Sequence, residues 1–416
     1  MNTRGAPLKL SILIVLAILG LAGAGWVNYL LASQGLGGRA FVVQYTAMRG
    51  LLMEKANPYD SSIAQQAGER LEAAWQGQNE VDLRYTSPLF SSILVLPFAA
   101  VADPLLAQAL WMTLQQAAAV AIILVSMSLA RWQPPRWVFF VFALLTILAY
   151  HGLGMFAEGG MVVWAALFWV LTLALLRAQR FELAGGVLAL AFVDPPVVLP
   201  GVILVLLWTV GRKKWAVLAW FLGVLILLSV IGEFLAPGWI LQYLQLVWKF
   251  SENFGGANPG QIFQIWWPAL GTALGWVLSG LLALVLLLEW WLVKPRDFRW
   301  FLWTACLTLA VTPWLGIPTR VQNFAVLWPS LVLLAAVLQE RWEKIGRWAT
   351  PAILLILLVW EWSSVVRLLS DPQPTTALSL IFPLPFMLLV SLFWVRWWAV
   401  RPPRLMVEEL RSLEND

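Results

Sequence analysis

Long uncharged runs alternate with short basic segments along this chain. Asp, Glu, Lys and Arg are absent from residues 10–38, 104–130, 137–157, 253–288 and 372–395. About 20 apolar residues are enough for a helix to cross the hydrocarbon core of a bilayer. The pattern therefore predicts an all-α, polytopic transmembrane bundle. We expect 11 to 13 spans, near residues 9–32, 87–102, 105–130, 137–151, 160–176, 183–193 with 197–210, 215–233, 269–292, 300–313, 321–338, 350–369 and 378–398.

The composition strengthens this interpretation. Of 416 residues, 61% are hydrophobic and 12% are charged, whereas a soluble domain has about 25% charged residues. Trp occurs 28 times, often at the ends of apolar runs, which is typical of anchors at the headgroup level. We expect this anchoring role for Trp132, Trp137, Trp208, Trp215, Trp266, Trp267, Trp290, Trp291, Trp397 and Trp398.

The basic residues predict the orientation. They cluster at residues 177–180, 212–214, 294–299, 341–347 and in the tail from 401, and basic loops are retained in the cytoplasm. The net charge of +5 is explained by these loops, so it does not indicate nucleic-acid binding. We expect both termini in the cytoplasm, residues 1–398 in one transmembrane domain, and residues 399–416 as a cytoplasmic tail. Residues 33–86 and 234–268 then face outward.

Two segments complicate the count of spans. Residues 177–180 and 212–214 both read as cytoplasmic, yet only one helix-length segment separates them. Asp194-Pro195-Pro196 interrupts that segment, because Pro removes a helical hydrogen bond and restricts the residue before it. Two half-helices that enter and return would resolve the conflict. A similar problem of parity affects residues 87–136.

The first outer loop carries dense charge. Residues 39–84 contain five Lys or Arg and six Asp or Glu. Within it, residues 63–75 place Ala67, Leu71 and Ala74 on one helical face and Glu69, Arg70 and Glu72 elsewhere. We expect one or two short helices lying at the membrane surface.

Several kinds of chemistry find no support in the sequence. It has no phosphate-binding Gly loop followed by Lys, one His, His151, and one Cys, Cys306. A His-rich metal site, a Ser-His-Asp triad and an internal disulfide are therefore disfavoured. Carboxylates and cations on the outer side are left as the candidate chemical groups. We expect no cofactor, and leave a divalent cation open.

Three ordered elements resemble a known family. They are Phe41-Val42-Val43-Gln44-Tyr45 followed by Asn57-Pro58-Tyr59-Asp60, then Arg84-Tyr85-Thr86-Ser87-Pro88-Leu89-Phe90 leading to Trp111, and finally Thr312-Pro313 with Arg320 and Gln322-Asn323-Phe324. Over residues 1–340 the chain is similar to the GT-C membrane glycosyltransferases, in particular bacterial glycosyltransferase family 87. The resemblance implies a GT-C-type bundle in the bacterial plasma membrane.

The chain departs from the family at several polar positions. The family's Asp after the first span, its expected general base, corresponds to Ala40 here. The Gly-Gln element falls near Glu158-Gly159-Gly160, the Lys-Pro element reads Asp194-Pro195, and the His-aromatic pair reads Asn323-Phe324. These changes leave the expected fold intact and weaken the expected activity.

The resemblance implies transfer of a hexose, mannose-like, from a polyprenyl-phosphate sugar to a lipid or envelope glycan at the outer face. Such a transfer needs a base for the acceptor hydroxyl and cations for the leaving phosphate. We predict Glu54, Asp60 or Glu158 as the base, although Asp60 also fits a helix cap. Predicted substrate- and phosphate-binding residues are Tyr45, Arg84, Tyr85, Asp194, Arg320 and Asn323.

Two other functions are left open. A catalytically inactive relative that binds a lipid-linked sugar or a partner enzyme is consistent with Ala40. A lipid or solute transporter is consistent with Asp194 in a broken membrane segment, because carboxylates there are costly and usually functional. A carboxylate lining a cavity near Arg84 or Arg320 would favour the enzyme.

Overall fold

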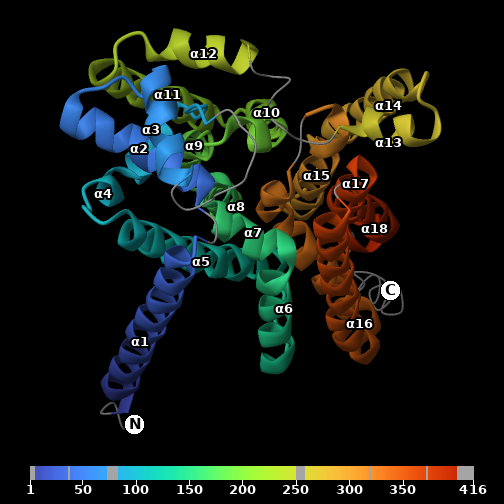
Figure 1. Cartoon of the computed structure of the whole chain (residues 1–416). Coiled ribbons are helices and arrows are strands. Elements are labelled where there is room, and N and C mark those ends of the chain that lie inside the picture. Colours follow the sequence, from blue (N-terminus) through green and yellow to red (C-terminus); the bar gives the residue numbers. More distant parts are fainter. Residues whose placement is uncertain are drawn as a thin grey trace, which may run out of the picture. The chain divides into compact units, whose positions relative to one another are not determined.

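The computed structural model describes residues 5–35, 38–72, 83–249, 258–317, 320–371 and 373–400. Within these ranges the secondary structure consists of α-helices and 3-10 helices without a strand. The chain is therefore all-α, as predicted (Figure 1). The helices are α1 Gly5–Ser33, α2 Arg39–Glu54, α3 Ser61–Glu72, η1 Leu89–Leu94, α4 Leu96–Ala99, α5 Pro104–Ala130, α6 Arg136–Leu148, α7 Tyr150–Glu158, α8 Val162–Arg177, α9 Phe181–Ala191, α10 Pro195–Gly211, α11 Trp215–Leu235, α12 Trp239–Lys249, α13 Pro259–Trp266, α14 Gly271–Val293, α15 Phe298–Val311, η2 Thr312–Leu315, η3 Val321–Leu327, α16 Trp328–Ser370, α17 Pro374–Ile381 and α18 Pro383–Val400.

The helices confirm a polytopic membrane protein. In the described ranges five segments are long and apolar enough to cross a bilayer, and α6 with α7, bent by 56° at their junction, would make a sixth. One of the five contains α16, whose backbone is not helical at Trp342 and Glu343, so this helix has two parts. Shorter apolar helices, α8, α9 and α10 among them, accompany these segments. The figure of 11 to 13 spans stays a prediction.

The span predicted at residues 87–102 is wrong. This segment forms the 3-10 helix η1 and the single turn α4, which together cover Leu89–Ala99. Pro88 and Pro97 explain the short pieces, because Pro lacks the N–H that a continuous helix needs. Only α5 of the segments between residues 87 and 136 is long enough to cross, which removes the parity problem there.

The predicted break at Asp194-Pro195-Pro196 is confirmed. Helix α9 ends at Ala191 and α10 begins at Pro195, with Asp194 as its N-cap residue. Pro is favoured in the first helical turn, where its missing N–H would have no intrahelical partner. The Asp194 carboxylate is also placed at the positive end of the α10 dipole. The two prolines thus lie at the start of α10, just after the break that separates it from α9.

The described residues form two compact units. Unit 1 comprises residues 1–117, 156–160 and 232–246, and unit 2 comprises residues 118–155, 161–231 and 247–416. In unit 1, α1 is joined to α5 through Asn28, which donates to Thr113 Oγ1 at 2.9 Å and exchanges hydrogen bonds with Gln116 at 3.1 Å. The prediction of a single domain over residues 1–398 stays a prediction.

Helix α15 is the centre of unit 2. Its residues from Phe301 to Val311 are all buried, and it packs against α10, α14, α16 and α18. Tryptophans fix its neighbours: Trp208 of α10 stacks on Phe301 at 4.1 Å, and Trp303 Nε1 donates to the Leu392 carbonyl of α18 at 2.9 Å. A helix that is apolar on every side is stable when other helices cover it on every side. By contrast, α11 and α14 leave most of their apolar side chains exposed, as lipid-facing helices do.

Trp residues are divided between core and surface. Trp132 and Trp208 are 5% exposed, so the predicted anchoring role is wrong for these two. Trp132 Nε1 donates to Gln339 Oε1 at 2.8 Å, and the Trp208 ring stacks on Phe301. Most of the other predicted anchors are at least 40% exposed: Trp137, Trp215, Trp266, Trp267, Trp291 and Trp397.

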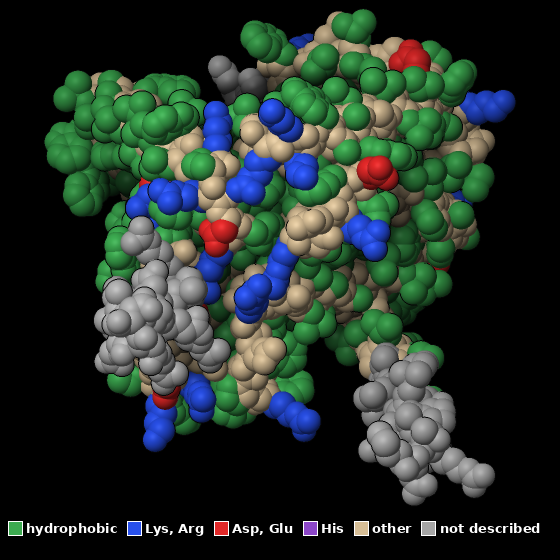
Figure 2. Space-filling model, turned by 180° about the vertical axis from the view of Figure 1, so that it is seen from behind, with side chains coloured by type: hydrophobic (Ala, Val, Ile, Leu, Met, Phe, Trp, Pro, Cys, Tyr) green, Lys and Arg blue, Asp and Glu red, His purple; other side chains and the backbone are tan. Residues whose placement is uncertain are grey.

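Contacts join the basic turns of unit 2 to neighbouring helix ends, and we call these turns together the basic face. Arg177 donates to the Ser128 carbonyl at the end of α5, and Arg212 donates to the Lys294 carbonyl. Arg299 donates to the Ala399 carbonyl and to Glu340 beside the α16 break. Figure 2 shows Lys and Arg side chains spread over the face of the molecule seen from behind, with few carboxylates among them.

The segment that was predicted to form the first outer loop contains two helices, α2 and α3. Helix α3 buries Ile63 and Ala67 and exposes Glu69 and Arg70, while α2 packs against it. Ala74 and Trp75, which were expected to extend this amphipathic face, lie outside the described residues, as do tail residues 401–416.

Candidate functional site

The N-terminal end of α2 is held by the segment 157–160 of unit 1. The Gly38 backbone N–H donates to the Ala157 carbonyl. Gly159, at φ 73°, passes so close to α2 that an added Cβ would lie 2.7 Å from the Phe41 Cβ. A Cβ on Gly160 would lie 3.9 Å from the Ala40 Cβ. Positive φ and close approach both require glycine at 159.

Helix α5 fixes the same segment from another side. Trp111 Nε1 donates to the Gly159 carbonyl at 2.8 Å, and Gln115 Nε2 donates to the Gly160 carbonyl at 2.7 Å. The Gln108 side chain occupies the space that a Cβ on Gly38 would need. Positions 108, 111 and 115 share one face of a helix because they are three and four residues apart. This face of α5 therefore meets both α2 and the segment 157–160.

Three buried amide side chains in this region keep an unused polar atom. Gln44 Oε1, Gln108 Nε2 and Gln115 Oε1 have no hydrogen-bond partner among the described residues. Each side chain is at most 5% exposed. Buried polar groups are normally hydrogen-bonded, so this region leaves one amide donor and two amide acceptors unpaired within the described residues. Sequence reasoning missed these residues, although Gln108 and Gln115 interrupt an apolar run at a spacing of seven.

Of the three predicted bases, the structure brings only Glu158 into this region. Glu158 is half-buried at the end of α7, between Ala157 and Gly159, which contact Gly38 and Phe41. Glu54 is exposed at the opposite end of α2, about 21 Å from Ala40 by helical rise. Asp60 is exposed and precedes α3, where its carbonyl accepts from the Ile63 N–H. Asp60 thus occupies the capping position that the sequence left open.

Tyr45 is fixed by hydrogen bonds within unit 1. It is 1% exposed, its hydroxyl donates to the Val101 carbonyl at 2.9 Å, and Arg49 donates to the hydroxyl at 3.3 Å. Arg49 and Arg70 also approach the face of its ring. The ring therefore holds α2 to the turn after α4, and it reaches a substrate only if these contacts open.

Tyr85 and the Asn57-Pro58-Tyr59 turn form a second packed cluster. Tyr59 and Tyr85 meet edge-to-face at 5.3 Å, and the Tyr59 hydroxyl donates to the Ser87 carbonyl at 3.0 Å. The Tyr85 hydroxyl contacts Ser92 and donates to the Pro88 carbonyl. Burial raises the pKa of Tyr85 to about 12, so its hydroxyl stays protonated at neutral pH. Asp60 and Arg84 are the chain neighbours of this tyrosine pair.

The predicted residues of unit 2 form a separate group. Asp194, at the start of α10, interacts electrostatically with Arg320, which precedes η3. Asn323 lines a small cavity of about 20 Å³ between α10, the end of α15 and η3. This volume holds about one water molecule, so the cavity does not admit a sugar in this conformation. Its other lining residues include Pro196, Thr312 and Pro313.

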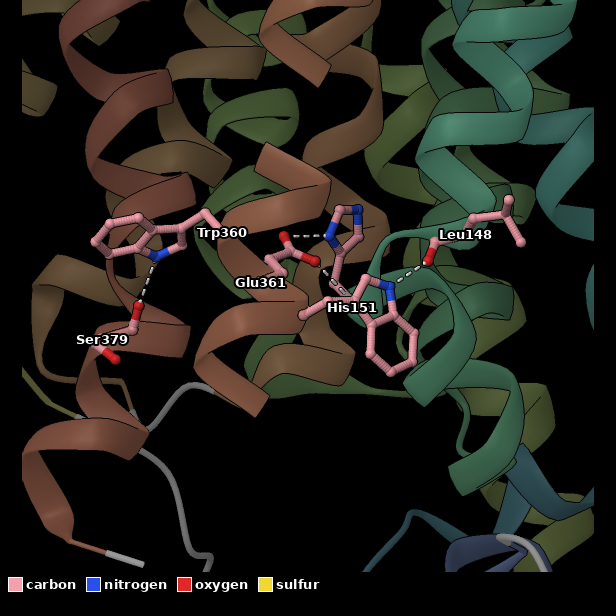
Figure 3. Close-up of polar contacts among 6 residues, drawn as sticks. Leu148, His151, Trp360, Glu361 and Ser379 are labelled. Atoms are coloured by element: carbon pink, nitrogen blue, oxygen red, sulfur yellow. Dashed lines mark hydrogen bonds and ion pairs between the residues drawn. The ribbon is translucent and has the colours of Figure 1, made fainter. Parts of the chain in front are cut away.

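A buried His–Glu pair connects α7 to α16 in unit 2 (Figure 3). His151 Nδ1 lies 2.7 Å from Glu361 Oε1, and the His151 backbone N–H donates to Oε2 at 3.2 Å. Both side chains are 3% exposed. The Glu361 carboxylate therefore also satisfies the first turn of α7, where N–H groups lack intrahelical partners. Glu361 was missed by sequence reasoning, although a carboxylate between Trp360 and Trp362 in an apolar run is itself a signal.

Comparisons with known proteins add no relative. No family model matches the chain, and neither the curated proteins nor the solved structures give a match. In the described residues no group of three or more His, Cys, Asp or Glu side chains is arranged to hold a metal ion.

The glycines of segment 157–160 provide a first prediction. Gly159→Ala combines a positive φ, which costs an L-residue about 1–2 kcal/mol, with a Cβ placed 2.7 Å from the Phe41 Cβ. We expect a lower unfolding temperature in detergent and displacement of Glu158 from α2. Gly160→Ala is the matched control, since its Cβ would make ordinary contact with Ala40. Equal stability of the two variants would contradict the described packing.

Proposed function

We propose that this protein is a membrane glycosyltransferase of the GT-C kind. It transfers a hexose from a polyprenyl-phosphate sugar to the hydroxyl of a lipid or cell-envelope glycan. The observation that supports the proposal most is the contact between segment 157–160 and the first turn of α2. Glu158 lies within that segment, whose Gly160 approaches the position where the resembled family carries Asp and this chain carries Ala40.

Each part of the proposed reaction is assigned to a group of unit 1. Glu158 removes the proton from the acceptor hydroxyl as its oxygen bonds to the anomeric carbon of the donor sugar. The bond from that carbon to the phosphate oxygen breaks, and its electrons leave with the polyprenyl phosphate. The unpartnered amide atoms of Gln44, Gln108 and Gln115 hydrogen-bond sugar or acceptor hydroxyls.

Arginines are proposed to stabilise the leaving phosphate, because a guanidinium pairs well with phosphate oxygens. Arg84 was predicted for this role. Arg39 is the chain neighbour of Ala40 at the start of α2 and is an additional candidate that sequence reasoning missed. The roles of Asp194, Arg320 and Asn323 in unit 2 stay predictions.

A transfer assay tests the proposal. Membranes containing the protein are incubated with polyprenyl-phosphate-mannose or polyprenyl-phosphate-glucose and lipid acceptors, and the labelled product is measured. The proposal expects release of polyprenyl phosphate together with a glycosylated acceptor. Absence of transfer for all donor and acceptor pairs, with the protein shown to be folded, would contradict it.

We also propose that the basic face lies at the cytoplasmic side of the plasma membrane. Helix order supports this, since basic connections recur along the chain at α5–α6, α8–α9, α10–α11, α14–α15 and the break in α16. The ends and turns between them carry other charged residues: Glu158 at the end of α7, Asp194 before α10, Glu233 near the end of α11, Arg320 before η3 and Asp371 after α16. Basic connections are retained inside, which assigns segment 157–160 and α2 to the outer side.

Cysteine accessibility tests this orientation. Cys306 is the single cysteine and is buried, so Cys306→Ala provides a background without thiols. We expect Gln65→Cys in α3 to react with an impermeant maleimide in intact cells. Lys214 is also exposed and lies between α10 and α11. We expect Lys214→Cys to react only after permeabilisation. The reverse result would place donor, acceptor and Glu158 on the wrong side and overturn the proposed function.

A non-enzymatic relative remains the second candidate. It is favoured by Ala40 and by the hydrogen bonds that hold Tyr45 away from a ligand. Such a protein would bind a polyprenyl-phosphate sugar without releasing polyprenyl phosphate. Equilibrium binding of the donor measured beside the transfer assay separates the two functions.

A further inference from the structure

The basic face contains a shallow cavity between α6 and α16 in unit 2. It is lined by Trp137 at the start of α6, and by Lys344, Arg347 and Trp348 after the α16 break. Its volume is about 470 Å³, which is in the range of ligand sites. All four lining side chains are exposed, so the cavity is accessible from the surface.

Charge in this cavity favours an anion. Its two charged lining residues, Lys344 and Arg347, are both cationic. Helix α6 begins at Arg136, and the second part of α16 begins after the non-helical Trp342 and Glu343. Two helices thus direct their positive ends toward the same place, which adds to the attraction of the side chains for negative charge.

Aromatic and apolar surfaces continue from the cavity along both helices. The rings of Trp137 and Trp348 are 4.8 Å apart, and Trp rings favour the headgroup level of a bilayer. Beyond Trp137, the exposed residues Phe140, Leu144 and Leu148 follow at helical spacing along α6. On α16, Ile356 and Val359 are also exposed.

The two helices run side by side from the cavity to the His151–Glu361 pair (Figure 1). The distance from Trp137 to Leu148 along α6 is about 17 Å by helical rise. A cationic cavity at one end and an apolar strip beyond it match an amphiphile with an anionic head. A soluble anion would make no use of the strip.

We infer that this cavity binds the phosphate of an anionic membrane phospholipid, with its acyl chains along α6 and the second part of α16. Lys344 and Arg347 contact the phosphate oxygens, and Trp137 and Trp348 enclose the glycerol region. Basic cavities between membrane helices on the cytoplasmic side bind anionic lipids in this manner. The inference is independent of sugar transfer.

Lipid binding to the purified full-length protein tests the inference. Phosphatidylglycerol and phosphatidylcholine with the same acyl chains are titrated into the detergent-solubilised protein, and bound lipid is counted by native mass spectrometry. We expect a preference for phosphatidylglycerol. The double variant Lys344→Gln/Arg347→Gln should weaken its binding by roughly tenfold or more, since each cation contributes separately to lipid attraction.

A matched control removes the same charge elsewhere on the basic face. Arg180→Gln/Lys213→Gln changes two exposed basic residues outside the cavity and should leave phosphatidylglycerol binding within about twofold, while the charge loss is identical. An equal loss in both double variants, or equal binding of phosphatidylcholine, would overturn the site. Displacement of the lipid by inorganic phosphate at millimolar concentration would assign the cavity to a free anion and would also overturn the inference.

Discussion

The Glu158→Gln variant is expected to lose sugar transfer by about 10²–10⁴-fold, the contribution typical of a positioned general base. The amide keeps the shape of the side chain and its place between Ala157 and Gly159, but it cannot accept the hydroxyl proton. Donor binding should change little, because the substituted atom acts on the acceptor. The measurement is the single-turnover rate with saturating polyprenyl-phosphate sugar, together with the donor dissociation constant.

Three further variants make this result specific to Glu158. Glu54→Gln and Asp60→Asn change exposed carboxylates at the far end of α2 and before α3, and should leave the rate nearly unchanged. Ala40→Asp in the Glu158→Gln background restores a carboxylate within reach of segment 157–160 and should recover part of the rate. Full activity of Glu158→Gln, or loss in Asp60→Asn alone, would assign the base to a different residue.

Removing one member of the His151–Glu361 pair is expected to cost about 3–5 kcal/mol of unfolding free energy, as for other buried pairs that lose one partner. His151→Ala leaves the Glu361 carboxylate 3% exposed with only the backbone N–H of position 151. Glu361→Ala leaves the His151 ring and the first turn of α7 without their acceptor. Unfolding of both variants is followed by heating in detergent and by denaturant titration.

A comparison of single and double variants separates pairing from packing. His151→Leu/Glu361→Leu removes both polar groups and should be less destabilised than either single alanine variant. Glu340→Gln serves as the control, because its ion pair with Arg299 is about one-third exposed and should contribute less than about 1 kcal/mol. If Glu340→Gln cost as much as Glu361→Ala, burial would not be the cause of the effect.

Two parts of the candidate site were present in the sequence pattern. Glu158 between apolar runs and beside two glycines was recognisable as a candidate base, and so was the tyrosine and proline sequence around residues 57–60 and 84–88. The structure distinguishes Glu158 from Glu54 and Asp60 through contacts of residues more than a hundred positions apart, such as Gly159 with Phe41. Sequence spacing contains no information about such contacts.

Other features were misread or missed for identifiable reasons. Residues 87–102 are as apolar as a span, but Pro88 and Pro97 divide them into a 3-10 helix and one α-helical turn. Gln108 and Gln115 appeared as minor interruptions of α5, because only the fold shows that Gln108 packs against Gly38 and that Gln115 donates to the Gly160 carbonyl. Glu361 was missed because its partner, His151, lies 210 residues earlier in the chain.

The sequence by itself determined that this is an all-α membrane protein with alternating basic connections and a helix break at Asp194. Those properties follow from local composition: uncharged runs must be helical in lipid to satisfy their backbone, and Pro cannot continue a helix. Only the tertiary structure decided that segment 157–160 contacts the first turn of α2, that His151 pairs with Glu361, and that Lys344 and Arg347 share a cavity with Trp137. In each case residues from distant segments of the chain come into contact, and the way the helices pack against one another determines which residues do so.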